Sequence, residues 1–178
     1  MSAHRNDKLE FIFGRRSIRV YGPAPISELE VSLLLQAAMA APSAMGKDPW
    51  RFVVVRRREM LTRLSAALPG GKMLSSSALA LVVCGDREAA LDQHLSYLLQ
   101  DCSAAIENLL LGAHALGLGA CWVGIHPSED AVRQVKELLS LPGLVVPIAV
   151  VSLGEPGERP EPRTRYNAAY VHSEKWQA

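Results

Sequence analysis

The sequence lacks an excess of charge of either sign. Its 178 residues include 19 lysines and arginines and 18 aspartates and glutamates, which gives a formal net charge of +1. A chain so balanced has no overall positive field with which to attract nucleic acid or an anionic membrane. We therefore expect no nucleic-acid partner and no membrane partner, and any anion must be bound by a local cluster of basic residues.

Cysteine is scarce as well. Cys84, Cys102 and Cys121 form no Cys-x-x-Cys pair and lie in apolar stretches, as reduced packing residues of a cytosolic protein commonly do. The polar N-terminus, residues 1–7, precedes no apolar segment of signal-peptide length. The expected location is therefore the cytoplasm.

No hydrophobic run is uniform enough to predict a membrane span. Residues 108–126 carry no charge, but they include Asn108, His114, His126 and several glycines and have no basic flanks. A buried helix that leads into a strand explains this segment better.

Familiar active-site signatures are also missing. The sequence contains no His-Glu-x-x-His, P-loop, nucleophile elbow or paired-cysteine metal site. The five histidines do not have the spacing of metal ligands, and Asp101 and Glu107 do not share a helix face. We expect no metal site, and any chemistry should come from a bound cofactor.

The sequence does contain an alternation of helical and strand periods over the length of one domain, which indicates an α/β or α+β fold. A capping box that begins at Ser27 opens one helix, and Pro42 follows it. The proline-rich segment 154–165 is expected to be extended. The pattern predicts helices over residues 8–13, 27–41, 91–116 and 128–139, and strands over residues 50–55, 78–84, 120–125 and 145–153.

Two features predict a partner subunit. Apolar residues of segment 91–116 cover well over half of the helix circumference, so this helix should be buried almost all round. At ~1.5 Å per residue it would span nearly 40 Å, which one chain of this size would struggle to cover. The last segment carries Tyr166, Tyr170, Val171 and Trp176, too much apolar surface for a free tail. It should dock on the body or on a second subunit.

Two groups of arginines are the strongest chemical feature. Residues 15–19 place three arginines around Ser17, and guanidinium forks match phosphate oxygens. Such a run alone is more typical of a solvated surface. Arg163 and Arg165 alternate in the extended tail and should point to one side of it. Two separate clusters in a nearly neutral protein suggest one shared anion.

Two further segments could contact a ligand. Residues 41–50 are most simply a connection between helix and strand with Trp50 in the core, although Met45 and Lys47 could equally face a ligand. Residues 117–124 do not fit the dinucleotide-binding fingerprint, because the glycine spacing is wrong and the segment leads from helix to strand. Their small residues would let backbone amides approach a flat ligand.

These segments together resemble the nitroreductase family of flavoproteins, particularly its short members. The likeness lies in residues 15–21, 41–55, 100–124 and 163–176, in an order and spacing that extend over nearly the whole chain. The resemblance implies a single α+β domain over residues 1–178, built as a three-layer sandwich with a central mixed sheet flanked by helices. It also implies an intertwined homodimer with two FMN sites at the subunit interface and an extended C-terminal tail over residues 154–178.

The resemblance further implies which residues bind the cofactor. No side chain is expected to be catalytic, because the flavin carries the chemistry. The implied FMN contacts are the N-terminal segment Arg15, Arg16, Ser17 and Arg19; the tail residues Arg163 and Arg165; the loop residues Pro42, Ser43, Ala44, Met45 and Lys47, which the second subunit lays against the flavin; and Cys121, Trp122, Val123 and Gly124, a strand end whose backbone amide faces flavin N5.

The loop departs from the family pattern at two positions. Gly46 stands where relatives commonly have Asn, and Asp48 where they commonly have Gln. We expect these departures to alter FMN affinity or potential.

The implied reaction is hydride transfer from NADH or NADPH to flavin N5, followed by reduction of a nitroaromatic, quinone or similar conjugated acceptor. Arg16 or Arg19 is the candidate positive charge near flavin N1. Short loops at residues 69–72 and 86–92 leave little material for a lid, so we expect an open and permissive pocket.

Two other functions stay open. The first is an FMN-binding protein that stores or senses the flavin without turnover, which the departures at Gly46 and Asp48 motivate. The second is a flavin-free dimeric scaffold, which would leave both arginine clusters without a purpose. Within the enzymes, an unusual acceptor such as a halogenated aromatic, or a reaction that consumes the flavin, is a further alternative.

Overall fold

Four strands form one sheet in a computed structural model that describes residues 7–176. The order across the sheet is β1-β2-β4-β3, and all three pairings are antiparallel. The expectation of a mixed sheet is therefore wrong for the strands of this chain. β1 and β2 follow each other in the chain, as do β3 and β4. Each connection leaves the sheet and re-enters it at the same end, so the two strands that it joins are antiparallel. The strands are β1 (Trp50–Val55), β2 (Leu79–Asp86), β3 (Gly119–Gly124) and β4 (Val145–Gly154).

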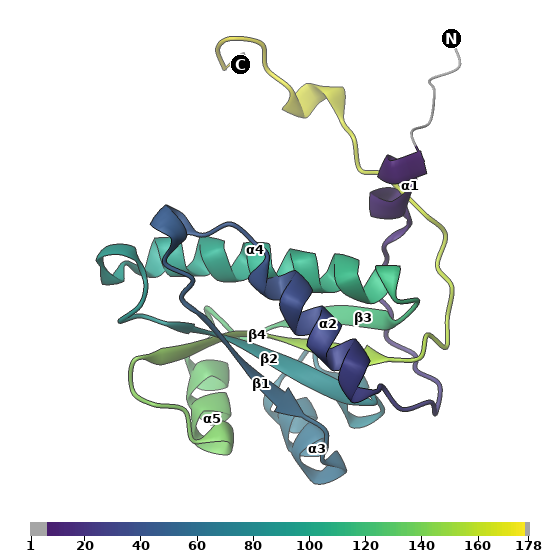
Figure 1. Ribbon diagram of the computed structural model, residues 1–178, viewed down its shortest axis with the longest axis vertical. Coiled ribbons are helices and arrows are strands. Elements are labelled where there is room, and N and C mark those ends of the chain that lie inside the picture. The colour runs from purple at the N-terminus through teal and green to yellow at the C-terminus, as the bar shows by residue number, and fades with distance from the viewer. Residues whose placement is uncertain (1–6, 177–178) are drawn as a thin grey trace.

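Helices cover both faces of this sheet (Figure 1). α2 (Glu28–Met39) and α4 (Leu95–Ala115) lie on one face, and α3 (Arg58–Ala67) and α5 (Glu129–Leu139) lie on the other. Successive residues of β2 point into the two cores in turn, Leu81 into the first and Val82 into the second. Burial on both faces explains why β2 carries no polar side chain from Leu79 to Gly85. The three-layer α+β sandwich is confirmed.

Local signals account for most helix ends. The Ser27 hydroxyl accepts a hydrogen bond from the Glu30 amide at 3.2 Å, and the Glu30 carboxylate accepts one from the Ser27 amide at 2.7 Å. This is the predicted capping box. α4 begins four residues later than predicted, because residues 91–93 form a short 3-10 turn in which Asp92 and Gln93 have positive φ. The other short 3-10 segments are η1 (Ala44–Gly46), η2 (Lys72–Ser75) and η4 (Ala168–Tyr170).

The sequence pattern does not predict α3. Four arginines at positions 56, 57, 58 and 63 make this segment look like a solvated loop. Nevertheless Leu61 and Leu64, three residues apart, are completely buried, and Ala67 follows them on the same face. Two apolar turns are therefore enough to seat the helix on the sheet.

The long helix α4 buries one face in this chain. Residues such as Leu98, Cys102 and Leu109 are buried against the sheet and α2, whereas Leu99 is half-buried and Tyr97 is exposed. One chain alone therefore does not give α4 the burial on all sides that the sequence pattern predicts for this helix. No helix within residues 7–176 is long and apolar enough to cross a membrane.

The C-terminal segment leaves the body after β4. Residues 155–158 still contact the N-terminal segment, as in the hydrogen bond from the Gly157 amide to the Val20 carbonyl at 2.8 Å. The later residues extend away from the sheet on the side of α1 (Asp7–Gly14) (Figure 1). Tyr166 and Trp176 are about four-fifths exposed. The distal tail, residues 166–176, thus does not pack against the sheet of its own chain. Docking on a partner stays a prediction.

Candidate functional site

The two arginine clusters meet at one cavity of about 580 Å³. Residues 12–19 form one side of it and residues 163–166 of the tail form the other. The lining contains five arginines and no acidic side chain, so the cavity concentrates positive charge in a nearly neutral protein. The lining residues are Ile12, Phe13, Arg15, Arg16, Ser17, Arg19, Arg163, Thr164, Arg165 and Tyr166.

Backbone and hydroxyl contacts hold the N-terminal arginine segment against the sheet. Ser17 forms an isolated parallel bridge with Ala120 at the start of β3, and the Ile18 amide donates to the Ala120 carbonyl at 2.9 Å. The Tyr21 hydroxyl lies 2.6 Å from Ser152 Oγ and 2.8 Å from the Ile18 carbonyl oxygen. Burial raises the pKa of Tyr21, so the hydroxyl stays protonated as a donor. The segment is therefore fixed relative to β3 and β4.

Glu158 ties the tail to the same segment. Its carboxylate accepts hydrogen bonds from the Arg19 amide at 2.6 Å and from the Val20 amide at 3.2 Å. The Arg16 guanidinium donates to the Glu161 carbonyl. These contacts place the tail arginines beside the first cluster. The sequence carries no signal for Glu158, because it captures backbone amides 138 and 139 residues away.

The helix α1 is anchored on the C-terminal half of α4. Arg15 Nε lies 3.4 Å from Glu107 Oε1, and the His114 ring stacks on Phe11 at 5.0 Å. Burial, together with the charge of Arg15, lowers the pKa of His114. Neutral His114 therefore fits beside the arginine cluster better than its protonated form does.

The predicted strand residues lie next to this segment on β3. Cys121 is buried beside Ser17, and burial raises the pKa of its thiol while the Arg19 charge and the Ser17 hydroxyl partly offset that effect. Val123 is buried, whereas Trp122 and Gly124 are exposed. β3 is an edge strand, and its outer edge pairs only at Ala120 within the described residues. Some backbone amides of residues 121–124 therefore face away from β4.

The predicted loop, residues 42–47, lies apart from the arginine cavity. It precedes β1, the edge of the sheet opposite β3, so two strands and roughly 14 Å separate the edges. The Ala44 amide donates to Asp101 Oδ1 near the start of α4, whereas Arg15 contacts α4 at Glu107 and α1 contacts it at His114, about 9 and 20 Å further along the helix. One chain thus brings together both arginine clusters and β3, but not the loop.

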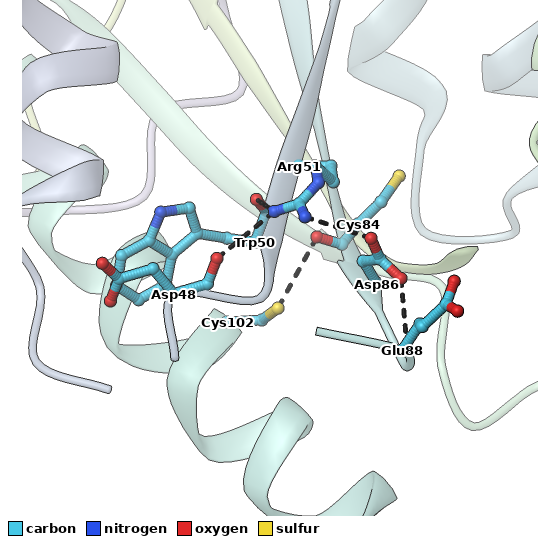
Figure 2. Close-up of polar contacts among 7 residues, drawn as sticks. All are labelled: Asp48, Trp50, Arg51, Cys84, Asp86, Glu88 and Cys102. Atoms are coloured by element: carbon cyan, nitrogen blue, oxygen red, sulfur yellow. Dashed lines mark hydrogen bonds and ion pairs between the residues drawn. The ribbon is translucent and has the colours of Figure 1, made fainter. Parts of the chain in front are cut away.

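The side chains of Ser43 and Asp48 pair with each other within the loop. The Ser43 hydroxyl donates to Asp48 Oδ1 at 2.5 Å and accepts from the Asp48 amide at 3.0 Å. Arg51 donates to the Asp48 carbonyl and forms an ion pair with Asp86 at 3.0 Å (Figure 2). The Asp48 carboxylate is therefore occupied by Ser43. Met45 projects outward and is 82% exposed.

The cysteines behind this loop belong to the core. The Cys102 thiol contacts the Cys84 carbonyl at 3.6 Å (Figure 2), and burial raises the pKa of both thiols to about 12. All three cysteines are free and buried, so their prediction as packing residues is confirmed. No group of three histidine, cysteine, aspartate or glutamate side chains within residues 7–176 is arranged to hold a metal ion.

Comparisons with known proteins place this chain among flavoprotein reductases over most of its length. The profile of the nitroreductase family matches residues 12–88 and 71–155. An Archaeoglobus fulgidus protein, provisionally named NADH dehydrogenase/NAD(P)H nitroreductase, is 44% identical over 171 residues that cover 94% of this chain and 98% of the relative.

Solved structures extend the likeness to three dimensions. A Parabacteroides distasonis protein with the same provisional name has a TM-score of 0.90 and 36% identity, over 97% of this chain and all of its own. A provisionally assigned nitroreductase of Desulfovibrio desulfuricans, solved in complex with FMN, has a TM-score of 0.82 and 31% identity, over 97% of this chain and 99% of its own. The fold is therefore shared over almost the whole chain.

Proposed function

This chain belongs to the nitroreductase family, and we propose that it is an FMN-dependent oxidoreductase that takes electrons from NADH or NADPH and passes them to a nitroaromatic, quinone or similar conjugated acceptor. The observation that carries this proposal is the cavity that five arginines line without an acidic side chain. A phosphate monoester is the ligand group that such donors fit best, and FMN ends in one.

The residues present fit FMN in charge and in shape. Arg15, Arg16 and Arg19 with Ser17 on one side, and the two tail arginines on the other, would hold the phosphate. Ala120 of β3 is paired with Ser17 of the N-terminal segment. From there β3 continues to Gly124 over roughly 13 Å, so an elongated ligand held by the arginines could extend along this strand. When bound, FMN would supply the hydride and electron chemistry that no side chain provides.

The chain's own residues would bind and tune the cofactor. Arg16 or Arg19 is the candidate cation near the pyrimidine end of the ring, where fixed positive charge favours added electrons. The backbone amides of residues 121–124 that point away from β4 would lie next to the flavin ring. Cys121 has a raised pKa and stays a neutral thiol, so it adds no competing negative charge beside the ring.

We also propose that the protein acts as a homodimer. The outer face of α4 and the distal tail leave apolar side chains in water, among them Tyr97, Tyr166 and Trp176. The loop at residues 42–47 does not line the arginine cavity of its own chain, and it precedes the edge strand opposite β3. A second copy would supply this loop to the site.

Steady-state consumption of NADH and NADPH by the FMN-loaded protein, with a quinone or a nitroarene added, tests the proposed enzyme. Turnover that depends on the acceptor and exceeds that of free FMN supports it. The alternative is storage or sensing of FMN, which the loop favours because the Asp48 side chain is occupied by Ser43. Tight FMN binding without turnover would support that alternative.

A further inference from the structure

α4 carries a buried carboxylate where its helical face is otherwise apolar. Asp101 is only 5% exposed and stands between the core residues Leu98 and Cys102. Every other acidic residue whose burial the structure describes is half-buried or exposed. An apolar side chain would suit this position better, because burying a charge is unfavourable without full pairing.

Asp101 is not fully paired. Oδ1 accepts a hydrogen bond from the Ala44 amide at 2.9 Å, and Oδ2 is buried with no donor among the described residues. The contact joins α4 to a segment 57 residues earlier in the chain. Burying this carboxylate costs free energy, and the Ala44 amide is its one hydrogen-bond partner among the described residues. We therefore look for the contribution of Asp101 in its effect on the loop that carries Ala44.

The partner belongs to a loop with an unusual backbone. Met45, Gly46 and Asp48 all have positive φ, at 52°, 63° and 48°. Two of these residues are not glycine, and such conformations persist only where other contacts impose them. The Ser43 to Asp48 hydrogen bonds close the loop on itself, but they do not attach it to the body. The Asp101 contact attaches the loop to α4 at Ala44, and Arg51 of β1 holds its other end at the Asp48 carbonyl.

We propose that Asp101 is a positioning residue, which fixes the loop Ser43–Asp48 on α4 so that Met45 and Lys47 project toward the flavin site of a second copy of the chain. The inference rests on the proposed function. The contacts that shape the loop all lie within one chain, so the loop is already formed before cofactor or partner arrives. Asp101 itself touches no cofactor and acts through the Ala44 amide.

Three variants and one control test this role. Asp101→Leu removes the acceptor, and Asp101→Asn keeps an oxygen at the same position. Ala44→Pro removes the donor from the loop side while Asp101 stays in place, and the extended backbone of Ser43 (φ −135°, ψ 159°) suits a residue before proline. Ser77→Ala removes a buried hydroxyl far along the chain from this loop.

The readouts are hydrogen–deuterium exchange of residues 42–48 in the FMN-free protein and the Kd for FMN. Loss of a hydrogen bond to a charged group predicts that Asp101→Leu and Ala44→Pro each speed loop exchange and raise the Kd by about tenfold. Asp101→Asn should stay within about threefold of wild type, since the acceptor is retained. Ser77→Ala should change neither readout.

The double variant separates positioning from general loss of packing. If both changes break one contact, their effects on the Kd do not add, and the double variant resembles either single variant. Wild-type loop exchange in Ala44→Pro, or full additivity, would overturn the inference, even if Asp101→Leu does not fold. A wild-type protein that binds no FMN would refute the proposed function, whereas the exchange measurement would still decide the role of Asp101.

Discussion

Removing a tail arginine should weaken FMN binding without weakening the fold. Arg163 and Arg165 are exposed, and neither has a hydrogen bond or ion pair with a described residue, although both line the cavity beside three other arginines. Replacement by alanine therefore breaks no hydrogen bond or ion pair within the described chain and relieves repulsion between like charges. The thermal midpoint of the FMN-free variants should be unchanged or raised.

The expected loss of affinity follows from the interaction removed. A hydrogen bond to a charged group contributes about 1.5–3 kcal/mol, so Arg163→Ala or Arg165→Ala should raise the Kd for FMN roughly 10- to 150-fold. Quenching of flavin fluorescence, titrated at fixed ionic strength, measures it. Arg159→Ala is the matched control, because Arg159 is exposed in the same tail but lines a neighbouring cavity instead.

Salt gives a second check on the same prediction. Raising the ionic strength from 0.1 to 1 M shortens the screening length from about 10 to about 3 Å, so wild type should lose more affinity than either variant. Wild-type FMN affinity in both tail variants, or equally weakened binding in Arg159→Ala, would contradict a phosphate contact from the tail arginines.

Three further outcomes follow from the structure. The lowered pKa of His114 keeps this ring neutral when folded, so the free energy of unfolding should fall as the pH drops below the ordinary value of 6.5, and urea titrations of His114→Gln should lose this component. Tyr21→Phe removes the buried hydroxyl contact with Ser152 and should cost about 1–2 kcal/mol in urea denaturation, with weaker FMN binding because the arginine segment loosens. In Gly85→Ala the new Cβ would lie 2.3 Å from the Leu98 side chain, so overpacking should cost about 1–3 kcal/mol, whereas a wild-type thermal midpoint would contradict the packing described.

The helical and strand periods predict most elements because burial patterns are local. The capping box at Ser27 and the apolar run of β2 are found where the sequence predicts them. α3 is not predicted, because its apolar face is short and lies among charged residues, with Leu61 and Leu64 as its two buried leucines. The direction of the strands is not predicted either, since strand pairing depends on the path of each connection rather than on any local pattern.

Some features of the site are likewise predicted from the sequence, and others are not. Guanidinium chemistry predicts that residues 15–19 and the tail arginines share an anion, and the structure brings them to one cavity. Glu158 and Asp101 are not predicted, because each captures a backbone amide that is distant in sequence. The distance between the cavity and the loop that precedes β1 is likewise a property of the sheet order.

An anaerobic titration tests whether this chain binds FMN and whether a nicotinamide reduces the bound flavin. The absorption spectrum of the protein loaded with FMN is recorded, and NADH or NADPH is then added without oxygen. We expect flavin bands that bleach with one of the two nicotinamides, and that return when a quinone or nitroarene is added. Bands that persist with both, or a protein that binds no FMN, would contradict it.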